Sequence, residues 1–191
     1  MSELMRAELK AVAKENLRGR VPFLIVCWII YVVLIGAVGW TGIGYLLLSG
    51  PLTLGIYGIL LTIHRGGEVS YNNLFEGFRN FLSPFLAFLL TSIFTFLWTL
   101  LFIVPGIMAA LRYSQTFYIL KDNPGMDGNE AIQKSKAMMD GHKGELFTLW
   151  LSFIGWYLLC VITLGIACIW VVPYVSMSLA GYYDWLKKEA S

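Results

Sequence analysis

The sequence has few charged residues and a large excess of hydrophobic ones. Charged residues make up 14% of the 191 positions and hydrophobic residues 58%, and the mean hydropathy is +0.68. Soluble domains carry about 25% charged residues, so this composition excludes an ordinary soluble domain. It predicts an all-α protein, a helical bundle that crosses a membrane several times, with membrane lipids around it and no nucleic acid as a partner.

The chain also lacks the residue patterns of a membrane-embedded enzyme. There is no paired-aspartate motif within an apolar segment, no HExxH, no serine with a partner histidine and no glycine-rich phosphate loop. The two histidines, His64 and His142, fall at the edges of apolar segments. Five carboxylates are better explained as turn formers, helix caps or solvated charges: Asp122, Asp127, Glu130, Asp140 and Glu145. We therefore expect no enzymatic activity, no cofactor and no metal site.

Cysteine is scarce as well. Cys27, Cys160 and Cys168 all lie in apolar segments, and their spacing does not match a metal site. Buried free thiols are the expected state. A disulfide between Cys160 and Cys168, which flank one predicted turn, is left open as the alternative.

The most informative feature present is the apolar run from Phe81 to Leu120. A transmembrane helix needs about 20 apolar residues, so this run is long enough for two. Proline breaks or starts a helix because it has no N–H to donate and its ring crowds the preceding turn. We therefore predict two antiparallel spans, Leu82–Val104 and Pro105–Leu120, with a turn at Pro105-Gly106.

The apolar segments of the whole chain predict six spans, arranged as three hairpins within one integral membrane domain, 1–191. Each hairpin follows a segment with one apolar and one charged face, which predicts an amphipathic helix at the cytoplasmic membrane surface. Asp127, with Glu130 three residues later, predicts the start of the third such helix. The predicted surface helices are Ser2–Arg18, Tyr71–Leu82 and Asp127 to about His142, and the predicted spans are Pro22–Trp40, Ile43–Ile63 with an interruption at Gly50-Pro51, Leu82–Val104, Pro105–Leu120, Leu146–Thr163 and Ile166–Tyr183.

The three similar units suggest parallel repeats over 1–66, 67–126 and 127–191. The alternative is that any hairpin protein with cytoplasmic linkers would show this pattern. Of the 14 lysines and arginines, 13 fall in the termini and the two long linkers, and none falls in the three short turns. Since short loops rich in Lys and Arg stay in the cytoplasm, we predict that both termini are cytoplasmic. The polar N-terminal segment has no signal-peptide pattern, and we expect a multi-pass protein of the bacterial inner membrane.

Arg112 is the one remaining basic residue, and it falls within a predicted span. An arginine near the centre of a transmembrane helix costs about 2.5–3.5 kcal/mol on insertion scales, and such residues usually face a bundle interior or a hydrated cavity. Simple snorkelling to the interface is the alternative. Because Pro51 and Pro173 fall at a similar depth in the other return spans, we predict a hydrated cavity for an anionic head group. Its candidate residues are Arg112, Tyr113, Gln115, Thr116, Pro51 and Pro173.

Several motifs resemble a known family. They include Val104-Pro105-Gly106-Ile107, Gly141-His142-Lys143-Gly144-Glu145 and Thr163-Leu164-Gly165-Ile166. The chain resembles the bacterial integral membrane family catalogued as domain of unknown function 975, specifically over about residues 100–184 and more loosely before Phe81. The resemblance implies a small multi-span bacterial membrane protein and supplies no catalytic or binding residue.

We therefore expect a non-enzymatic binding or transport component for a lipid, a peptide or another amphiphilic or anionic molecule. The alternative is an assembly partner for other membrane proteins, acting as a chaperone or an insertase-like scaffold. A membrane-protein partner or a homo-oligomer fits either hypothesis.

Overall fold

The computed structural model describes residues 3–39 and 41–189, and these residues form helices and connecting turns with no strand. The prediction of an all-helical protein is confirmed. The predicted end of the first span, Trp40, and the predicted first residue of the chain's surface helix, Ser2, lie outside the described residues. The helices are α1 (Glu3–Asn16), α2 (Val21–Gly39), α3 (Ile43–His64), the 3₁₀ helix η1 (Tyr71–Phe78), α4 (Leu82–Leu101), α5 (Ile103–Tyr113), α6 (Thr116–Asp122), α7 (Gly128–Met138), α8 (Lys143–Leu151), α9 (Ile154–Ile162) and α10 (Cys168–Glu189).

Four segments of the described chain are long and apolar enough to cross a membrane, which fits a membrane protein. They are Val21–Gly39, Ile43–His64, Leu82–Leu101 and Lys143–Ile162. The arrangement of six spans is not confirmed. α5 and α6 are each too short to cross alone, and in α10 the tyrosines, the serines and Asp184 lower the hydropathy. Half of the residues of α10 are buried within the bundle, so it does not need an apolar surface on every side.

The hairpin between α4 and α5 turns earlier than predicted. α4 ends at Leu101, Phe102 is extended, and α5 begins at Ile103. Pro105 therefore lies in the first turn of α5, where its missing N–H leaves no hydrogen bond unmade. The turn predicted at Pro105-Gly106 is thus wrong, although proline does mark the start of the returning helix.

The prediction of one helix over Pro105–Leu120 is also wrong, because the chain breaks at Ser114 and Gln115 between α5 and α6. The Ser135 hydroxyl, from α7, satisfies this break. It donates a hydrogen bond to the Arg112 carbonyl at 2.7 Å and accepts one from the Gln115 N–H at 3.3 Å. A partner distant in the sequence thus stabilises a break that no local pattern predicts.

Other boundaries differ in smaller ways. The helix expected over Leu146–Thr163 is divided into α8 and α9 at Ser152 and Phe153. Conversely, α3 is continuous through Pro51, so the interruption expected at Gly50-Pro51 is wrong. The start of α7 is confirmed, since the Asp127 carboxylate accepts a hydrogen bond from the Asn129 N–H at 3.0 Å.

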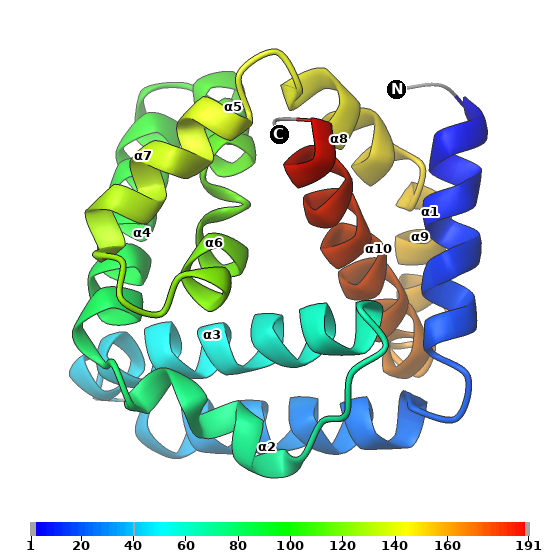
Figure 1. The fold of residues 1–191 in the computed structure, drawn as a ribbon, viewed down its shortest axis with the longest axis horizontal. Helices are drawn as coiled ribbons and strands as arrows, with labels where there is room; N and C mark the ends of the chain where they lie inside the picture. Colours follow the sequence, from blue (N-terminus) through cyan, green and yellow to red (C-terminus); the bar gives the residue numbers. More distant parts are fainter. Residues whose placement is uncertain (1–2, 40, 190–191) are drawn as a thin grey trace.

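The helices form three groups around a central region (Figure 1). α2 and α3 lie along one side, α4 to α7 along a second, and α8 to α10 with α1 along the third. Each of the three helices predicted to lie at the surface packs on a helix from a different predicted unit. α1 packs on α10, η1 on α3, and α7 on α6 and α4. The three repeats therefore stay a prediction.

Close backbone contacts fix η1 against α3. A methyl group on Gly55 would overlap the Leu74 carbonyl, and one on Gly77 would overlap the Pro51 carbonyl. Leu74 is fully buried, whereas Tyr71 and Phe75 remain 46% and 45% exposed. Leu74 and the close approach at the two glycines therefore fix η1 against α3, and an ion pair between Glu76 and Lys121 adds a contact to α6.

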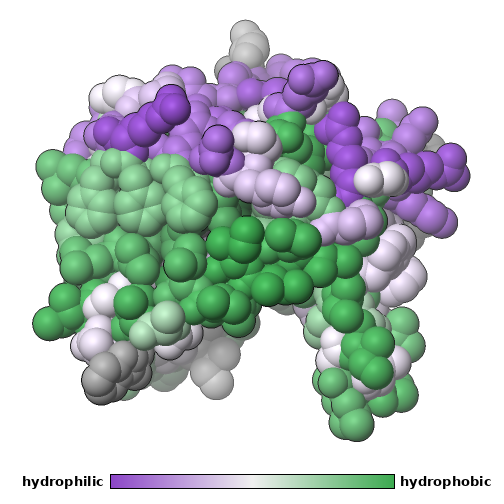
Figure 2. Space-filling view, turned by 90° about the horizontal axis from the view of Figure 1, so that it is seen from below, coloured by the Kyte–Doolittle hydropathy of each residue, from purple (hydrophilic) through white to green (hydrophobic). Residues whose placement is uncertain are grey.

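Polar and apolar surfaces are separated. Figure 2, viewed from the lower edge of Figure 1, shows hydrophilic residues along one edge and an apolar surface over most of the remainder. The helix ends next to the short turns carry strongly exposed apolar side chains, such as Val104, Ile162 and Leu164. This polarity fits a protein whose short turns lie at the far end of an apolar layer.

Candidate functional site

A groove between α4, α5 and α7 contains two of the predicted site residues. Its volume is about 620 Å³, within the range of ligand sites. We call it the Arg112 groove. It is lined by Phe94, Leu97, Trp98, Leu100, Leu101, Arg112, Tyr113 and Lys136.

Arg112 lies in the last turn of α5 and is exposed at this groove. Its position follows from the break at Ser114 and Gln115, since the helix ends directly after it. A positive charge is favourable there, because the carbonyl end of a helix carries partial negative charge. The sequence predicts Arg112 within a long span, whereas in the structure it lies at a helix end.

Lys136 of α7 provides a second positive charge at the same groove. Its Nζ lies 5.8 Å from the centre of the Phe94 ring and 5.6 Å from that of Tyr113. These two rings are 6.2 Å apart. A cation within about 6 Å of an aromatic face is attracted by the negative potential of that face, and this attraction holds the ammonium group at the rim. From the sequence, Lys136 is expected on the polar face of a surface helix, and its position at this groove was not predicted.

The field of Arg112 reaches the carboxylate of Asp140. The pKa of the exposed Asp140 is lowered, first by the hydrogen bond from Lys143 at 2.8 Å and to a smaller extent by the charge of Arg112. The rim therefore carries two cations beside an acidic residue that already has a basic partner.

The floor of the groove is apolar. Leu97, Trp98 and Leu101 follow Phe94 at helical spacing along α4, so they continue from the cationic rim toward the short turn at Phe102. Trp98 and Leu101 are 45% and 63% exposed. Chemically, the groove offers cations at one end and a strip of apolar side chains leading away from them.

The other predicted site residues lie elsewhere. Gln115 and Thr116 are buried, and the Gln115 Oε1 and Thr116 Oγ1 have no hydrogen-bond partner among the described residues. Pro51 is buried in α3 beneath η1, and Pro173 of α10 lines a different groove, against α2. The structure thus brings Arg112 and Tyr113 together and does not bring the two prolines to them.

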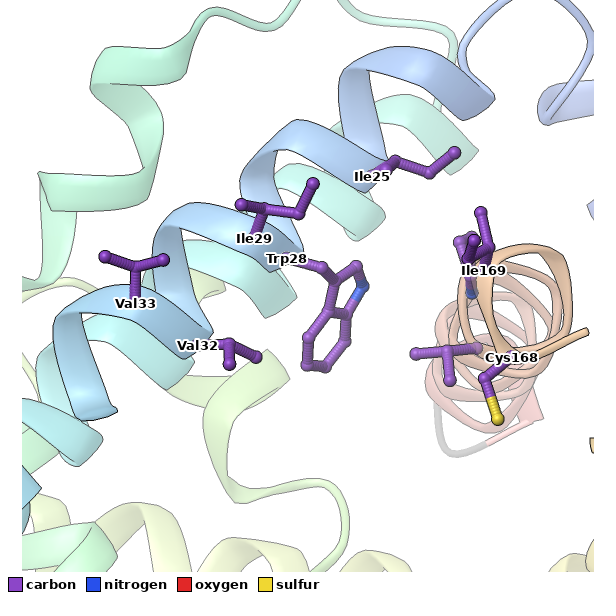
Figure 3. Close-up of a pocket in the computed structure, with 9 residues that line it drawn as sticks. Ile25, Trp28, Ile29, Val32, Val33, Cys168 and Ile169 are labelled. Atoms are coloured by element: carbon purple, nitrogen blue, oxygen red, sulfur yellow. The ribbon is translucent and has the colours of Figure 1, made fainter. Parts of the chain in front are cut away.

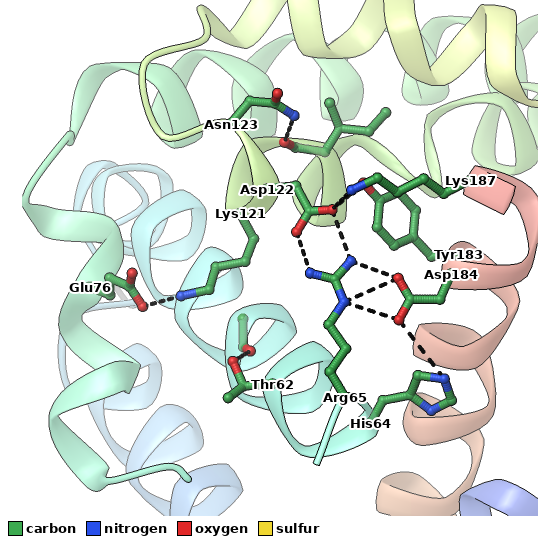
Figure 4. Close-up of polar contacts among 12 residues, drawn as sticks. Thr62, His64, Arg65, Glu76, Lys121, Asp122, Asn123, Tyr183, Asp184 and Lys187 are labelled. Atoms are coloured by element: carbon green, nitrogen blue, oxygen red, sulfur yellow. Dashed lines mark hydrogen bonds and ion pairs between the residues drawn. The ribbon is translucent and has the colours of Figure 1, made fainter. Parts of the chain in front are cut away.

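A cluster of ion pairs joins the hydrophilic ends of α3, α6 and α10 (Figure 4). The Arg65 guanidinium donates to both oxygens of Asp122, at 2.6 and 2.9 Å, and to both oxygens of Asp184, at 2.6 to 3.2 Å. Asp122 also accepts from the Lys187 Nζ at 2.6 Å and the Tyr183 hydroxyl at 3.0 Å. The cluster connects one helix from each hairpin.

Asp122 is the most enclosed charged residue of this cluster, with its side chain 10% exposed. Burial alone would raise its pKa, but the hydrogen bonds from Arg65 and Lys187 outweigh burial and lower the pKa to about 2. The carboxylate is therefore ionised at neutral pH and holds the helix ends together. The interpretation of Asp122 as a turn former missed this pairing. A signal was present, since Arg65, Asp122 and Asp184 each fall where a hairpin's last apolar segment meets a polar stretch.

The three cysteines are free in the structure. The disulfide considered between Cys160 and Cys168 is not formed.

An all-helical fold with four segments long and apolar enough to cross a membrane fits a helical membrane protein. The family described as "Protein of unknown function (DUF975)" matches residues 1–111 and 101–190, and the chain belongs to this family. This confirms the resemblance stated from the sequence. No curated protein and no solved structure matches the chain.

Proposed function

We propose that this protein is a non-enzymatic component of the bacterial inner membrane that binds an anionic amphiphile, most simply an anionic lipid, in the Arg112 groove. The observation that carries the proposal is that Arg112 and Lys136 both line one groove whose floor is apolar. A phosphate has oxygen atoms for both cations, and guanidinium groups bind phosphate with two parallel hydrogen bonds. Acyl chains match the strip of apolar side chains that follows along α4.

The proposal includes six membrane crossings as three hairpins, with both termini in the cytoplasm. In this arrangement α5 and α6 together form one interrupted crossing, and α10 forms another with half of its residues buried. Broken helices within a membrane are tolerated where protein or a hydrated cavity satisfies the freed backbone groups, as Ser135 does at the break after α5.

Lipid binding is tested by native mass spectrometry of the purified protein. Phosphatidylglycerol and phosphatidylcholine with identical chains are supplied together, so that only the head-group charge differs. We expect phosphatidylglycerol to be retained preferentially. Replacing Arg112 or Lys136 by Gln should each reduce this preference by about threefold to tenfold, since a hydrogen bond to a charged group contributes about 1.5–3 kcal/mol and solvent exposure weakens it. Arg112→Lys should retain part of it, because the charge remains but the two-pronged geometry is lost.

Lys134→Gln is the matched control, because Lys134 lies on α7 but does not line the groove. Equal retention of both lipids, or an equal effect of Lys134→Gln and Arg112→Gln, would contradict the proposal. A protein retained in stoichiometric amount without any preference between the lipids would favour the assembly-partner hypothesis.

The orientation is tested with single cysteines introduced into a variant without Cys27, Cys160 and Cys168. Cysteines at Thr41, at Leu164 and at Phe102, the exposed residue of the turn between α4 and α5, should react with membrane-impermeant reagents added outside intact cells. Cysteines at Asn73 and Gly128 should not. Reaction at Asn73 or Gly128 in intact cells would reverse the proposed orientation, which depends on the placement of Lys and Arg.

A further inference from the structure

A second groove lies between α2 and α10, remote from Arg112. Its volume is about 450 Å³, and Figure 3 shows Trp28 of α2 extending toward Cys168 and Ile169 of α10. Its lining includes Trp28, Ile29, Val32, Cys168 and Ile169. None is charged, and three of them are more than half exposed: Ile29, Val32 and Ile169.

Trp28 is the only group lining this groove whose side chain carries an N–H donor. Its Nε1 is buried and has no hydrogen-bond acceptor within the described part of the chain. The indole lies in the gap between α2 and α10 (Figure 3), and its ring packs edge to face on Tyr31 at 5.7 Å. A buried tryptophan N–H usually has a partner, because an unmet donor in an apolar site is unfavourable. The groove therefore needs an occupant that is apolar and has at least one acceptor oxygen.

The position of Trp28 along α2 selects among such occupants. Trp28 follows Val21, the first residue of α2, by seven positions, or about two helical turns. Arg18 and Arg20 lie on the polar side of that helix start. The groove then continues from Trp28 through Ile29 and Val32 toward the apolar end of α2. An acceptor near the polar edge, with an apolar chain leading away from it, is the order of groups in the acyl ester of a membrane lipid.

A transmembrane helix of another protein fits less well. Its backbone carbonyls are already hydrogen-bonded within the helix, because the bilayer offers no other partner. It would leave the Trp28 N–H unmet unless a polar side chain happened to face it. An ester carbonyl is free to accept.

We propose that the groove between α2 and α10 holds one acyl chain of a diacyl lipid, with the Trp28 N–H donating a hydrogen bond to its ester carbonyl. This site recognises the ester and the chain, whereas the Arg112 groove recognises head-group charge. The two sites do not share a lining residue.

The test compares two lipids that differ only at the proposed acceptor. Diacyl phosphatidylcholine and dialkyl phosphatidylcholine of the same chain length are supplied in equal amounts to the purified full-length protein. Retained lipid is then measured by native mass spectrometry. The ether-linked lipid lacks the carbonyl, so we expect the ester-linked lipid to be retained roughly threefold to tenfold more, as one net hydrogen bond predicts. Trp28→Phe keeps the ring and its packing on Tyr31 but removes the N–H, and should abolish the preference.

A second pair of variants tests the location. Val32→Trp fills the groove and should reduce the retention of both lipids. Val26→Trp makes the same change at an exposed position of α2 that does not line the groove, and should leave retention unchanged. Both variants are compared with the wild-type protein by thermal unfolding, so that a folding defect is recognised.

Four outcomes would overturn the inference. They are equal retention of the two lipids by the wild-type protein, a preference that survives Trp28→Phe, equal effects of Val32→Trp and Val26→Trp, and a dimer that Val32→Trp dissociates. Both lipids of this test carry the same head group without net charge, so the Arg112 groove does not distinguish between them. Failure here is thereby distinguished from failure of the proposed anionic site.

Discussion

Removal of the Arg65 side chain is expected to destabilise the whole bundle, because Arg65 pairs with a carboxylate from each of the other two hairpins. In Arg65→Leu, Asp122 and Asp184 would lose their shared partner while remaining 10% and 17% exposed. Removing one partner of a fully buried pair costs about 3–5 kcal/mol, and an exposed pair contributes about 0–1 kcal/mol. Arg65 itself is 39% exposed. We therefore expect an intermediate loss of about 2–3 kcal/mol.

For a chain of this length, 1 kcal/mol corresponds to about 2–4 °C in Tm. Arg65→Leu should thus lower Tm by roughly 5–10 °C in detergent at pH 7, followed by circular dichroism. Lys143→Leu is the control. Its partner Asp140 is 80% exposed, so that variant should lose at most about 1 kcal/mol.

A combined variant separates charge from packing. Asp122 keeps Lys187 as a partner, whereas Asp184 keeps only His64, at 3.9 Å. Adding Asp184→Asn to Arg65→Leu removes that poorly compensated carboxylate and should restore part of the lost stability. The reasoning would be refuted if Arg65→Leu shifted Tm no more than Lys143→Leu. It would also be refuted if Asp184→Asn gave no recovery.

Three further perturbations test other contacts. The pKa of Asp122 is about 2 in the folded protein and 3.8 without its partners. Its stabilisation should therefore be fully present above about pH 5 and be lost as the pH falls toward 2. Asp122→Asn should flatten that part of the curve of unfolding free energy against pH by about 1 kcal/mol after allowance for screening. Gly55→Ala should lower the free energy of unfolding by about 1–3 kcal/mol because its methyl group would displace the Leu74 carbonyl, whereas Gly36→Ala, which meets no atom within 4 Å, should be neutral or stabilising. Ser135→Ala should cost about 1–3 kcal/mol in a urea unfolding experiment by leaving two backbone groups at the break after α5 unpaired, and no change in the unfolding midpoint would show that the break needs no side-chain partner.

The sequence predicts the long apolar helices well. The first predicted span, Pro22–Trp40, corresponds to α2, and the second, Ile43–Ile63, corresponds to α3. The Asp127 cap is placed correctly because capping is a local interaction between a side chain and the next backbone N–H groups. Composition and local chemistry determine these features, so no knowledge of packing is needed.

The helix breaks could not be predicted in the same way. The chain around Ser114 contains no proline or glycine, and the hydroxyl that satisfies the break comes from Ser135, twenty residues beyond Gln115. Pro51, by contrast, predicts a break that packing against η1 and α4 does not allow to develop. Tertiary contacts decide both cases, and they act against the local signal at one site and without one at the other.

The candidate site was found in part. The cost of a charge within an apolar segment identified Arg112, and Tyr113 follows it in the same groove. Lys136 was missed because it belongs to a different helix, and sequence spacing does not reveal that α7 packs along α4. The shared depth of Pro51 and Pro173 was misleading, because equal depth in two helices does not place them beside a third.

The packing of α1 on α10 has a consequence for the order in which the protein assembles. Ala13 and Leu17 are 1% and 2% exposed, and Leu9 packs toward Gly181 of α10. α1 leaves the ribosome first, but the helix that covers it is made last, after more than 150 intervening residues. Until then its apolar side chains are exposed unless they bind the membrane surface or a chaperone. A chain stopped after α9 should therefore leave α1 sensitive to proteolysis while α2 and α3 are already protected. The packing of α1 on α10 then forms in one late step.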